Sequence, residues 1–228
     1  MKARLIAARE LAPDICHFEF ESADWPLDFA PGQFVSLTKD GITRAYSVAS
    51  PPSLTPDSKT GSGRFALCAN LVQDGKFSPF LFGMQTGDEV DFKGPLGTFV
   101  LRRPAADSLF VATGTGIAPF RSMLHAQPDR KITLIFGVRH AHSLLYHDEL
   151  QALADRNPDF IYQPTLTRPP EDWTGKTGRV QQHTFDALGD RHDMDIYICG
   201  MKEMVDDLRT QLKARGYDRK RIIYEKYD

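Results

Sequence analysis

Hydrophobic and polar residues alternate over short runs in the first hundred residues of the chain. Segments such as RLIAAREL, QFVSLTK and RFALCANLV place apolar side chains at alternate positions or in small groups. Turn-forming sequences such as PG, DG, PP and GSG separate these segments. A period of two is typical of strands with one buried face, and many short strands at this spacing predict an antiparallel β-barrel or sandwich. The polar stretch 51–63 is predicted to be a loop.

The pattern changes near residue 104. Longer, nearly continuous apolar runs such as KITLIFGV and DIYICG now alternate with amphipathic stretches at helical spacing. Alternation of apolar strands with helices predicts a parallel α/β sheet. We therefore expect two domains, residues 1–103 and residues 104–228. The helices of the second domain are expected near 118–126, 143–156 and 202–215.

Composition and charge exclude several classes of protein. Hydrophobic residues make up 41% of the 228 positions and charged residues 25%, which is ordinary for a globular protein. The net charge of −2 gives no strong attraction to nucleic acid. No apolar run approaches the roughly 18 residues of a membrane-spanning helix, and the charged amino terminus does not resemble a signal peptide.

The three cysteines are scattered, at Cys16, Cys68 and Cys199. They form no C-x-x-C pair, so we expect neither a zinc site nor a cysteine-ligated iron–sulfur cluster. An odd, sparse count also argues against a disulfide framework, and this favours a reducing, cytoplasmic location. His140, His142 and His147 have no acidic neighbours with suitable spacing, so no metal is expected there either.

A glycine-containing loop, VATGTGIAPF at 111–120, follows the first predicted strand of the second domain. Gly114 and Gly116 allow a sharp turn and a close approach of the backbone to a ligand. Pro119 stands where a dinucleotide fingerprint has its third glycine, and proline is tolerated in the first turn of a helix. Helix amino termini bind anions, so the loop fits a nucleotide. Taken alone, it is equally well explained as a tight turn without a ligand.

Two further stretches carry candidate binding residues. In TRAYSVAS, strand alternation places Arg44 and Tyr46 on one face and Ser47 on the other. Arginine can bind a phosphate bidentately, and tyrosine can pack against a planar ring. In DGKFSPFLF, Ser78 is the expected N-cap and Pro79 the first residue of a short helix, whose amino terminus would be directed at an anion. Exposed polar strand residues and a capped surface helix remain the simpler explanations for each stretch alone.

The motifs together carry more information than any one of them. PGQF (31–34), RAYS (44–47), GKFS (75–78), GTGIAP (114–119) and CGMKEMV (199–205) stand in the order and spacing of the ferredoxin–NADP reductase family, which the chain resembles over nearly its whole length. The resemblance implies an antiparallel β-barrel that binds FAD, followed by an α/β domain that binds NADP(H). The proline form of the loop resembles the nicotinamide-dinucleotide loop of this family.

The resemblance also implies roles for individual residues. Arg44 corresponds to the ligand of the flavin pyrophosphate, Tyr46 to the residue packed on the isoalloxazine, and Ser47 to a group near flavin N5. Ser47, Cys199 and Glu225 are the expected catalytic residues. The expected cofactor-binding residues are Arg44, Ala45, Tyr46, Ser47, Gly75, Lys76, Phe77, Ser78, Thr113, Gly114, Thr115, Gly116, Arg139, Thr167, Arg168, Arg179, Cys199, Gly200, Met201 and Tyr227.

The carboxyl terminus, YEKYD, resembles the acidic-x-aromatic ending of the same family. By that resemblance Tyr227 stacks on the flavin face that the nicotinamide occupies. The additional Asp228 departs from the pattern, and the alternative is that Tyr224 and Tyr227 complete an edge strand against the core.

Nucleotide and acceptor preference rest on charge. Arg139 and Arg168 follow predicted strands, Arg179 lies close by, and no acidic residue follows YQPTLT to bind a ribose hydroxyl. These cations favour NADP(H). The basic run KARGYDRKR (213–221) could bind an acidic ferredoxin or flavodoxin, or be an ordinary solvated helix end.

The expected activity is hydride transfer between NADP(H) and flavin N5, with electrons passed to a ferredoxin or flavodoxin. Two alternatives remain open. One is an NAD(P)H:flavin reductase or the reductase component of an oxygenase. The other is a non-catalytic, flavin-holding subunit of a larger electron-transfer complex.

Overall fold

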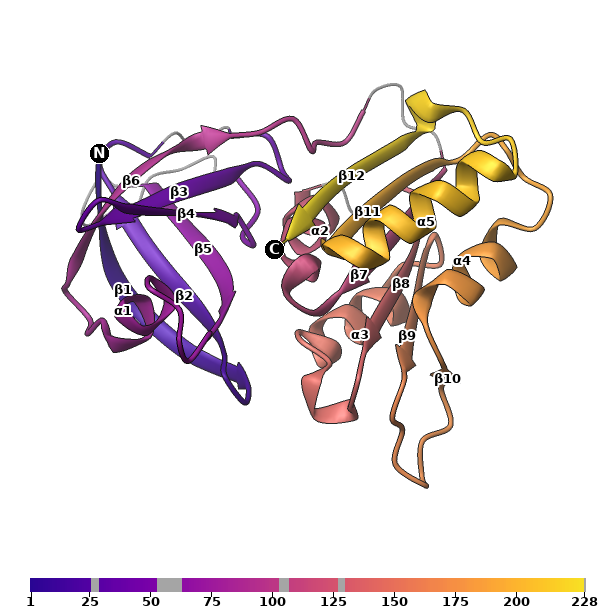
Figure 1. Cartoon of the computed structure of the whole chain (residues 1–228), viewed down its shortest axis with the longest axis horizontal. Coiled ribbons are helices and arrows are strands. Elements are labelled where there is room, and N and C mark those ends of the chain that lie inside the picture. Colours follow the sequence, from indigo (N-terminus) through magenta and orange to yellow (C-terminus); the bar gives the residue numbers. More distant parts are fainter. Residues whose placement is uncertain (26–28, 53–62, 103–106, 127–129, 228) are drawn as a thin grey trace. The chain divides into compact units, whose positions relative to one another are not determined.

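The computed structural model describes residues 1–25, 29–52, 63–102, 107–126 and 130–227. These divide into two compact units, coloured along the sequence in Figure 1. Unit 1 comprises Met1–Leu101 and Ala118–Ala126, and unit 2 comprises Arg102–Ile117 and Gln127–Asp228. The expected boundary between 103 and 104, Asp228, and most of the polar stretch 51–63 lie outside the described residues.

Unit 1 is built on a six-stranded sheet in which every neighbouring pair is antiparallel, in the order β4-β3-β6-β1-β2-β5. A further antiparallel bridge, Val48 to Leu67, joins the segment after β4 to β5, the strand at the other end of that order. The antiparallel sheet predicted for the first domain is thus confirmed. Its elements are β1 (Lys2–Ala12), β2 (Ile15–Ser22), β3 (Phe34–Lys39), β4 (Ile42–Ser47), β5 (Gly63–Asn70), α1 (Ser78–Gly83) and β6 (Glu89–Leu96).

Helix α2 (Ala118–Ala126) belongs to unit 1 by its contacts, although it lies in the second half of the sequence. Arg121 donates from Nη1 to the carbonyl oxygen of Ala49 at 2.9 Å. The next residue, Ser122, donates from its hydroxyl to the carbonyl oxygen of Ser50 at 2.7 Å. These bonds attach α2 to the segment directly after β4.

Unit 2 is a six-stranded parallel sheet in the order β10-β9-β8-β7-β11-β12, which confirms the parallel α/β sheet predicted for the second domain. The short helical turns η1 (Gly114–Ile117), η2 (Ala141–Ser143) and η3 (Arg219–Arg221) connect its elements. Its strands and helices are β7 (Ser108–Thr113), β8 (Ile132–Val138), α3 (His147–Arg156), β9 (Phe160–Leu166), β10 (Lys176–Thr177), α4 (Val180–Leu188), β11 (Asp195–Met201), α5 (Lys202–Ala214) and β12 (Ile222–Tyr227).

The apolar periodicity of these elements is explained by the two faces of the parallel sheet. Helices α4 and α5 cover one face, where Val180 and Leu208 join a core cluster with Val111 and Ile198 of the central strands. Helix α3 meets β9 through His147, whose ring contacts Tyr162. Among the described helices none is long and apolar enough to cross a membrane.

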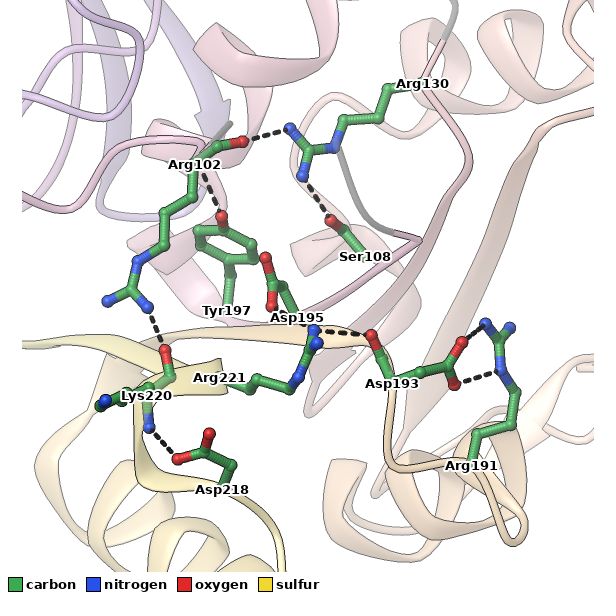
Figure 2. A network of polar contacts seen from close by, with 10 residues as sticks. All are labelled: Arg102, Ser108, Arg130, Arg191, Asp193, Asp195, Tyr197, Asp218, Lys220 and Arg221. Carbon is green, nitrogen blue, oxygen red and sulfur yellow. Dashed lines mark hydrogen bonds and ion pairs between the residues drawn. The ribbon is translucent and has the colours of Figure 1, made fainter. Parts of the chain in front are cut away.

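The amino ends of β7 and β11 are tied together by a network of polar contacts, shown in Figure 2. Arg102 takes part with three groups: its amide donates to the Tyr197 hydroxyl at 2.9 Å, its side chain donates to the carbonyl oxygen of Lys220, and its own carbonyl accepts from Arg130 at 3.2 Å. Arg130 also donates to the Ser108 hydroxyl at 3.1 Å. The first residue of unit 2 is therefore held on the sheet by both its backbone and its side chain.

The same network contains a bidentate ion pair. Arg191 forms a bidentate contact with the Asp193 carboxylate, with N···O distances of 2.8 and 3.0 Å, and a further bond of 2.9 Å to Asp107. Arg221 donates to the carbonyl oxygen of Asp193 and to the Asp195 carboxylate, at 2.7 and 3.0 Å. Arg221 is thus a structural cation at this end of the sheet.

Candidate functional site

The residues of RAYS lie on β4 in unit 1, and the pairing of β4 with β3 is regular from Ile42 to Ser47. Arg44 and Tyr46 therefore share one face, and Ala45 and Ser47 share the other, as the alternation predicted. Arg44 is exposed and donates from Nη1 to the carbonyl oxygen of its neighbour Thr43 at 2.8 Å. No carboxylate among the described residues pairs with it, so its guanidinium fits an external anion.

Tyr46 offers a flat surface that is uncharged at neutral pH. Its ring lies 6.1 Å from that of Phe77, centroid to centroid, at a tilt of 39°. Burial raises the pKa of Tyr46 to about 12, against the opposing charge of Arg44. Ser47, at the end of the strand, is buried, and Ala45 is exposed.

The expectation that Ser78 caps helix α1 is wrong. Phe77 occupies the position before the helix, and Ser78 is its first residue. The Ser78 hydroxyl accepts from the amide of Val72 at 2.9 Å and donates to the carbonyl oxygen of the same residue at 3.3 Å. Closure of the 72–78 loop therefore uses the side chain that sequence reasoning assigned to the helix.

The rest of GKFS is divided between surface and core. A Cβ at Gly75 would lie 2.8 Å from the Val72 carbonyl oxygen, so the close packing of the loop requires glycine. Lys76 is exposed, whereas Phe77 is buried in the core of unit 1. An external ligand can therefore meet the Lys76 side chain, while the Phe77 ring supports Tyr46 from within.

In unit 2 the candidate nucleotide loop lies at the point where the strand order reverses. Strand β7 has β8 on one side and β11 on the other, and η1 follows β7 directly. Crevices outside the carboxyl ends of strands at such a switch point are the usual ligand sites of open parallel sheets. Gly114, the first residue of η1, adopts φ +54°, which favours glycine.

The loop packs backbone against backbone on the end of β11. A Cβ at Gly116 would lie within 2.7 Å of the carbonyl carbon of Cys199. A Cβ at Gly200, where φ is +147°, would collide with the hydroxyl and carbonyl oxygens of Thr113. The glycines of two motifs some 80 residues apart are thus required by the same contact.

Thr113 leaves one polar atom unsatisfied at this contact. Its Oγ1 is buried and has no hydrogen-bond partner among the residues that the structure describes. An unpaired buried hydroxyl is costly, so it is suited to a ligand that supplies the missing bond. The half-buried Thr115 lies two residues further on. This end of the sheet therefore fits the phosphate- and amide-bearing part of a nucleotide.

Cys199, Glu225 and Tyr227 are brought together by the parallel pairing of β11 with β12. The register sets Cys199 beside Glu225 and Met201 beside Tyr227. Cys199 is fully buried, and its burial raises the pKa of the thiol well above the usual range; the Glu225 carboxylate adds to this, while a hydrogen bond with Tyr227 opposes it. The thiol is therefore neutral and covered, and the accessible side chain beside it is Met201, which is 58% exposed.

The three arginines expected to favour NADP(H) follow three neighbouring strands. Arg139 comes after β8, Arg168 after β9 and Arg179 after β10. The amide of Arg168 donates to the carbonyl oxygen of Arg139 at 2.8 Å, and that of the exposed Thr167 to Val138 at 3.1 Å. All three arginines are exposed and make no ion pair with the described residues.

Sequence reasoning missed the side chains that hold the last of these arginines. Thr165 donates from Oγ1 to the carbonyl oxygen of Gly178 at 3.0 Å, and His183 Nε2 lies 2.8 Å from that of Thr177. No spacing in the sequence marks either residue, because both bonds depend on how α4 and β9 pack. The stacked pair His140 and His142 forms part of no group of three potential metal ligands among the described residues.

Comparison with known proteins gives both units a counterpart. Residues 2–101 match the oxidoreductase FAD-binding domain family, and residues 110–210 match the oxidoreductase NAD-binding domain family.

Two curated relatives are similar over nearly the whole chain. The chain is 37% identical to ferredoxin–NADP reductase B of Sorangium cellulosum, covering 100% of the chain and 97% of that protein. It is 33% identical to the toluate 1,2-dioxygenase electron transfer component of Pseudomonas putida, over 99% of the chain. In the second case the chain spans 67% of the relative.

Solved structures show the same fold. A cytochrome P450 reductase from Amycolatopsis superposes with a TM-score of 0.86 at 24% identity, over 99% of this chain and 69% of that one. A ferredoxin NADP⁺ reductase from Neisseria gonorrhoeae, with bound FAD and NADP, superposes with a TM-score of 0.82 at 25% identity, over 99% and 98% of the two chains.

Proposed function

The chain belongs to the ferredoxin–NADP reductase family and is an NAD(P)H-to-flavin oxidoreductase, and we propose that it oxidises NADPH and delivers the electrons singly to a ferredoxin or flavodoxin. The observation that carries the proposal is the contact between Gly116 and the Cys199–Gly200 segment at the switch point of the parallel sheet. The loop, with its unsatisfied Thr113 hydroxyl, thus packs on the end of β11, and the next strand, β12, carries Glu225 and Tyr227.

Unit 1 holds FAD in this proposal. FAD held there would supply hydride acceptance and release of electrons one at a time, which is chemistry that amino-acid side chains lack. The exposed Arg44 binds the pyrophosphate, together with the backbone around Gly75 and Ser78. Tyr46, neutral because burial raises its pKa to about 12, would pack on the ring system, and Ser47 would be the group near N5.

Unit 2 holds the nicotinamide dinucleotide. The residues from Thr113 to Gly116 bind it through backbone amides and the Thr113 hydroxyl. The neutral Cys199 thiol places no negative charge beside the nicotinamide, and Glu225 can hold or pass a proton there. By the resemblance of the YEKYD ending, Tyr227 would supply an aromatic ring for stacking on the bound flavin. The contribution of these groups to the rate is orientation and exclusion of water, because hydride transfer needs no nucleophile.

NADPH is the proposed nucleotide because Arg139, Arg168 and Arg179 follow the neighbouring strands β8, β9 and β10 and form no ion pair with any residue that the structure describes, so a ribose phosphate could bind them. Arg168→Glu is expected to raise KM for NADPH at least about tenfold, the loss of one charge-assisted contact, with a much smaller change for NADH. Steady-state kinetics with both nucleotides measures this. Arg156→Glu, at the exposed end of α3, is the matched control, and equal losses with both nucleotides would contradict the preference.

The carrier is proposed from the family and from the relative that is a ferredoxin–NADP reductase. The basic run 213–221 does not support docking by charge, because Arg215 lies over the Phe185 ring and Arg221 is paired with Asp195. The run also ends where β12 begins, at the opposite end of the strand from Tyr227. The similarity to an oxygenase electron transfer component keeps an oxygenase as a second candidate acceptor.

The spectrum of the purified protein tests the proposal. We expect a bound yellow chromophore that anaerobic NADPH bleaches, followed by reduction of added ferredoxin or flavodoxin by the isolated chain. A colourless protein that takes up no added FAD would overturn the assignment. Rapid reduction of free flavin with no reduction of either carrier would instead favour a flavin reductase.

A further inference from the structure

The turn that carries Arg179 is held by two buried side chains that the proposed chemistry does not use. Thr165 is fully buried, and its hydroxyl donates to the carbonyl oxygen of Gly178 at 3.0 Å. His183 is 8% exposed, and its Nε2 lies 2.8 Å from the carbonyl oxygen of Thr177. A carbonyl can only accept, so His183 must carry its proton on Nε2 to make this bond.

Few other contacts fix the turn among the residues that the structure describes. Strand β10 has two residues, which pair with Thr165 and Leu166 of β9, and Trp173 Nε1 donates to the carbonyl oxygen of Lys176 at 2.9 Å. Gly178 adopts φ +99°, and its amide donates to Leu166 at 2.8 Å. Arg179 follows in an extended conformation before the first turn of α4, with no side-chain cap on the helix. The bonds from Thr165 and His183 therefore supply two of the few restraints on the backbone that precedes Arg179.

We propose that His183 and Thr165 are positioning residues that fix Arg179 for the phosphate of the nucleotide's adenosine ribose. The inference rests on the proposed function, because it requires that end of the nucleotide to lie at the edge formed by β8, β9 and β10. An arginine on a restrained turn loses less conformational freedom when it binds, and affinity gained in this way is selective for the ligand that contacts it.

The surroundings of the imidazole identify a matched pair of substitutions. Nδ1 has no hydrogen-bond partner among the described residues, and the Asp186 carboxylate is 3.8 Å away. The bond to Thr177 is thus the one hydrogen bond of the ring in that part of the chain. In His183→Gln an amide N–H can reach the same carbonyl, whereas in His183→Leu similar bulk remains without a donor.

Titration calorimetry on the flavin-loaded protein tests the proposal, with adenosine 2′,5′-bisphosphate, NADP⁺ and NAD⁺ as probes. We expect His183→Leu to weaken binding of the two probes that carry the 2′-phosphate by about five- to thirtyfold, the equivalent of one lost hydrogen bond. The affinity for NAD⁺ should not change. His183→Gln should restore most of the affinity. The control Gln182→Leu, on the same helix, removes a hydrogen bond to Asp186 and should change the affinity for none of the three probes.

A double-mutant cycle separates positioning from stability. If His183 acts through Arg179, then His183→Leu has no further effect on phosphate affinity in an Arg179→Ala background. Additive effects, or an equal loss of NAD⁺ and NADP⁺ binding, would overturn the inference while leaving the function intact. If Arg179→Ala leaves the ratio of the affinities for NADP⁺ and NAD⁺ unchanged, both the inference and this part of the proposed nucleotide site are wrong.

Thr165 keeps the inference testable if the histidine variants fold poorly. Thr165→Val retains the shape of the side chain and removes the hydroxyl, and Thr165→Ser retains the hydroxyl. The proposal requires the selective loss of phosphate affinity in Thr165→Val and not in Thr165→Ser. Identical behaviour of the two variants would contradict it.

Discussion

Close contacts determine which residue types the candidate site requires, and sequence patterns predict only some of these contacts. The glycines of GTG and CG were predicted to approach a ligand, and the structure shows that Gly116 packs against Cys199 of β11 and Gly200 against Thr113 of β7. The assignment of Ser78 as a helix cap failed because its hydroxyl closes a loop instead. His183 and Thr165 could not be predicted, since their partners are backbone carbonyls that only the tertiary fold brings near.

Gly116→Ala tests this contact at the scale of one methyl group. The added Cβ meets backbone atoms of Cys199, which cannot rotate away, so we expect a loss of about 1–3 kcal/mol in the free energy of unfolding. Gly83→Ala, whose Cβ would meet nothing within 4 Å, is the control and should be close to neutral. Urea denaturation followed by fluorescence measures both. Equal stability of the two variants would contradict the prediction, because it would mean that the loop can shift to accommodate the added methyl group at little cost.

Tyr46 provides a prediction in alkaline solution. Burial raises its pKa to about 12, above the ordinary value of 10, so folding favours the neutral phenol. Its contribution to stability is therefore present below pH 10 and is lost as the pH rises through about 12. The absorbance of the wild type at 295 nm minus that of Tyr46→Phe isolates this one tyrosine, and the difference should rise near pH 12. A Tyr46 transition near pH 10 would contradict the burial.

At the scale of elements, periodicity predicted most strands and helices because each has one face that must be buried. The alternating runs became the antiparallel strands, and the apolar runs became the central parallel strands β7, β8 and β11. Strand β10 has only two residues, too few for any pattern. The basic run 213–221 is a possible docking site in the sequence, because a sequence does not show which groups bind each charged side chain. In the structure Arg221 donates hydrogen bonds to Asp193 and Asp195.

The ion pair at the start of β11 predicts how the second unit responds to acid. The hydrogen bonds that Arg191 donates to the Asp193 carboxylate lower the pKa of Asp193 to about 2. The stabilisation is therefore present above pH 3.8 and is lost as the pH falls through about 2. Asp193→Asn should melt at a lower temperature than the wild type at pH 7, and the difference should shrink steadily below pH 4. A difference in melting temperature that does not depend on pH would assign the effect to something other than the charge.

For the whole molecule, the set of motifs identified the family, while no single motif could. Each short match has an ordinary structural explanation, but their joint order along the chain restricts the possibilities to one architecture, and the two matched domain families agree with it. The membership of α2 in unit 1 was not predictable, because the rhythm of strands and helices follows the sequence, whereas Arg121 and Ser122 bind a segment some 70 residues earlier.

The attachment of Arg102 has a practical consequence for anyone who dissects this protein into halves. A cut after residue 103, the place that the change of rhythm suggests, leaves Arg102 on a fragment without Tyr197, Lys220 and Arg130, its three partners. The same cut puts helix α2 on the other fragment, while its bonding partners Ala49 and Ser50 stay with the antiparallel sheet. No single break in the chain yields two intact pieces, so independent production of the halves calls for a transplanted helix as well as a new terminus.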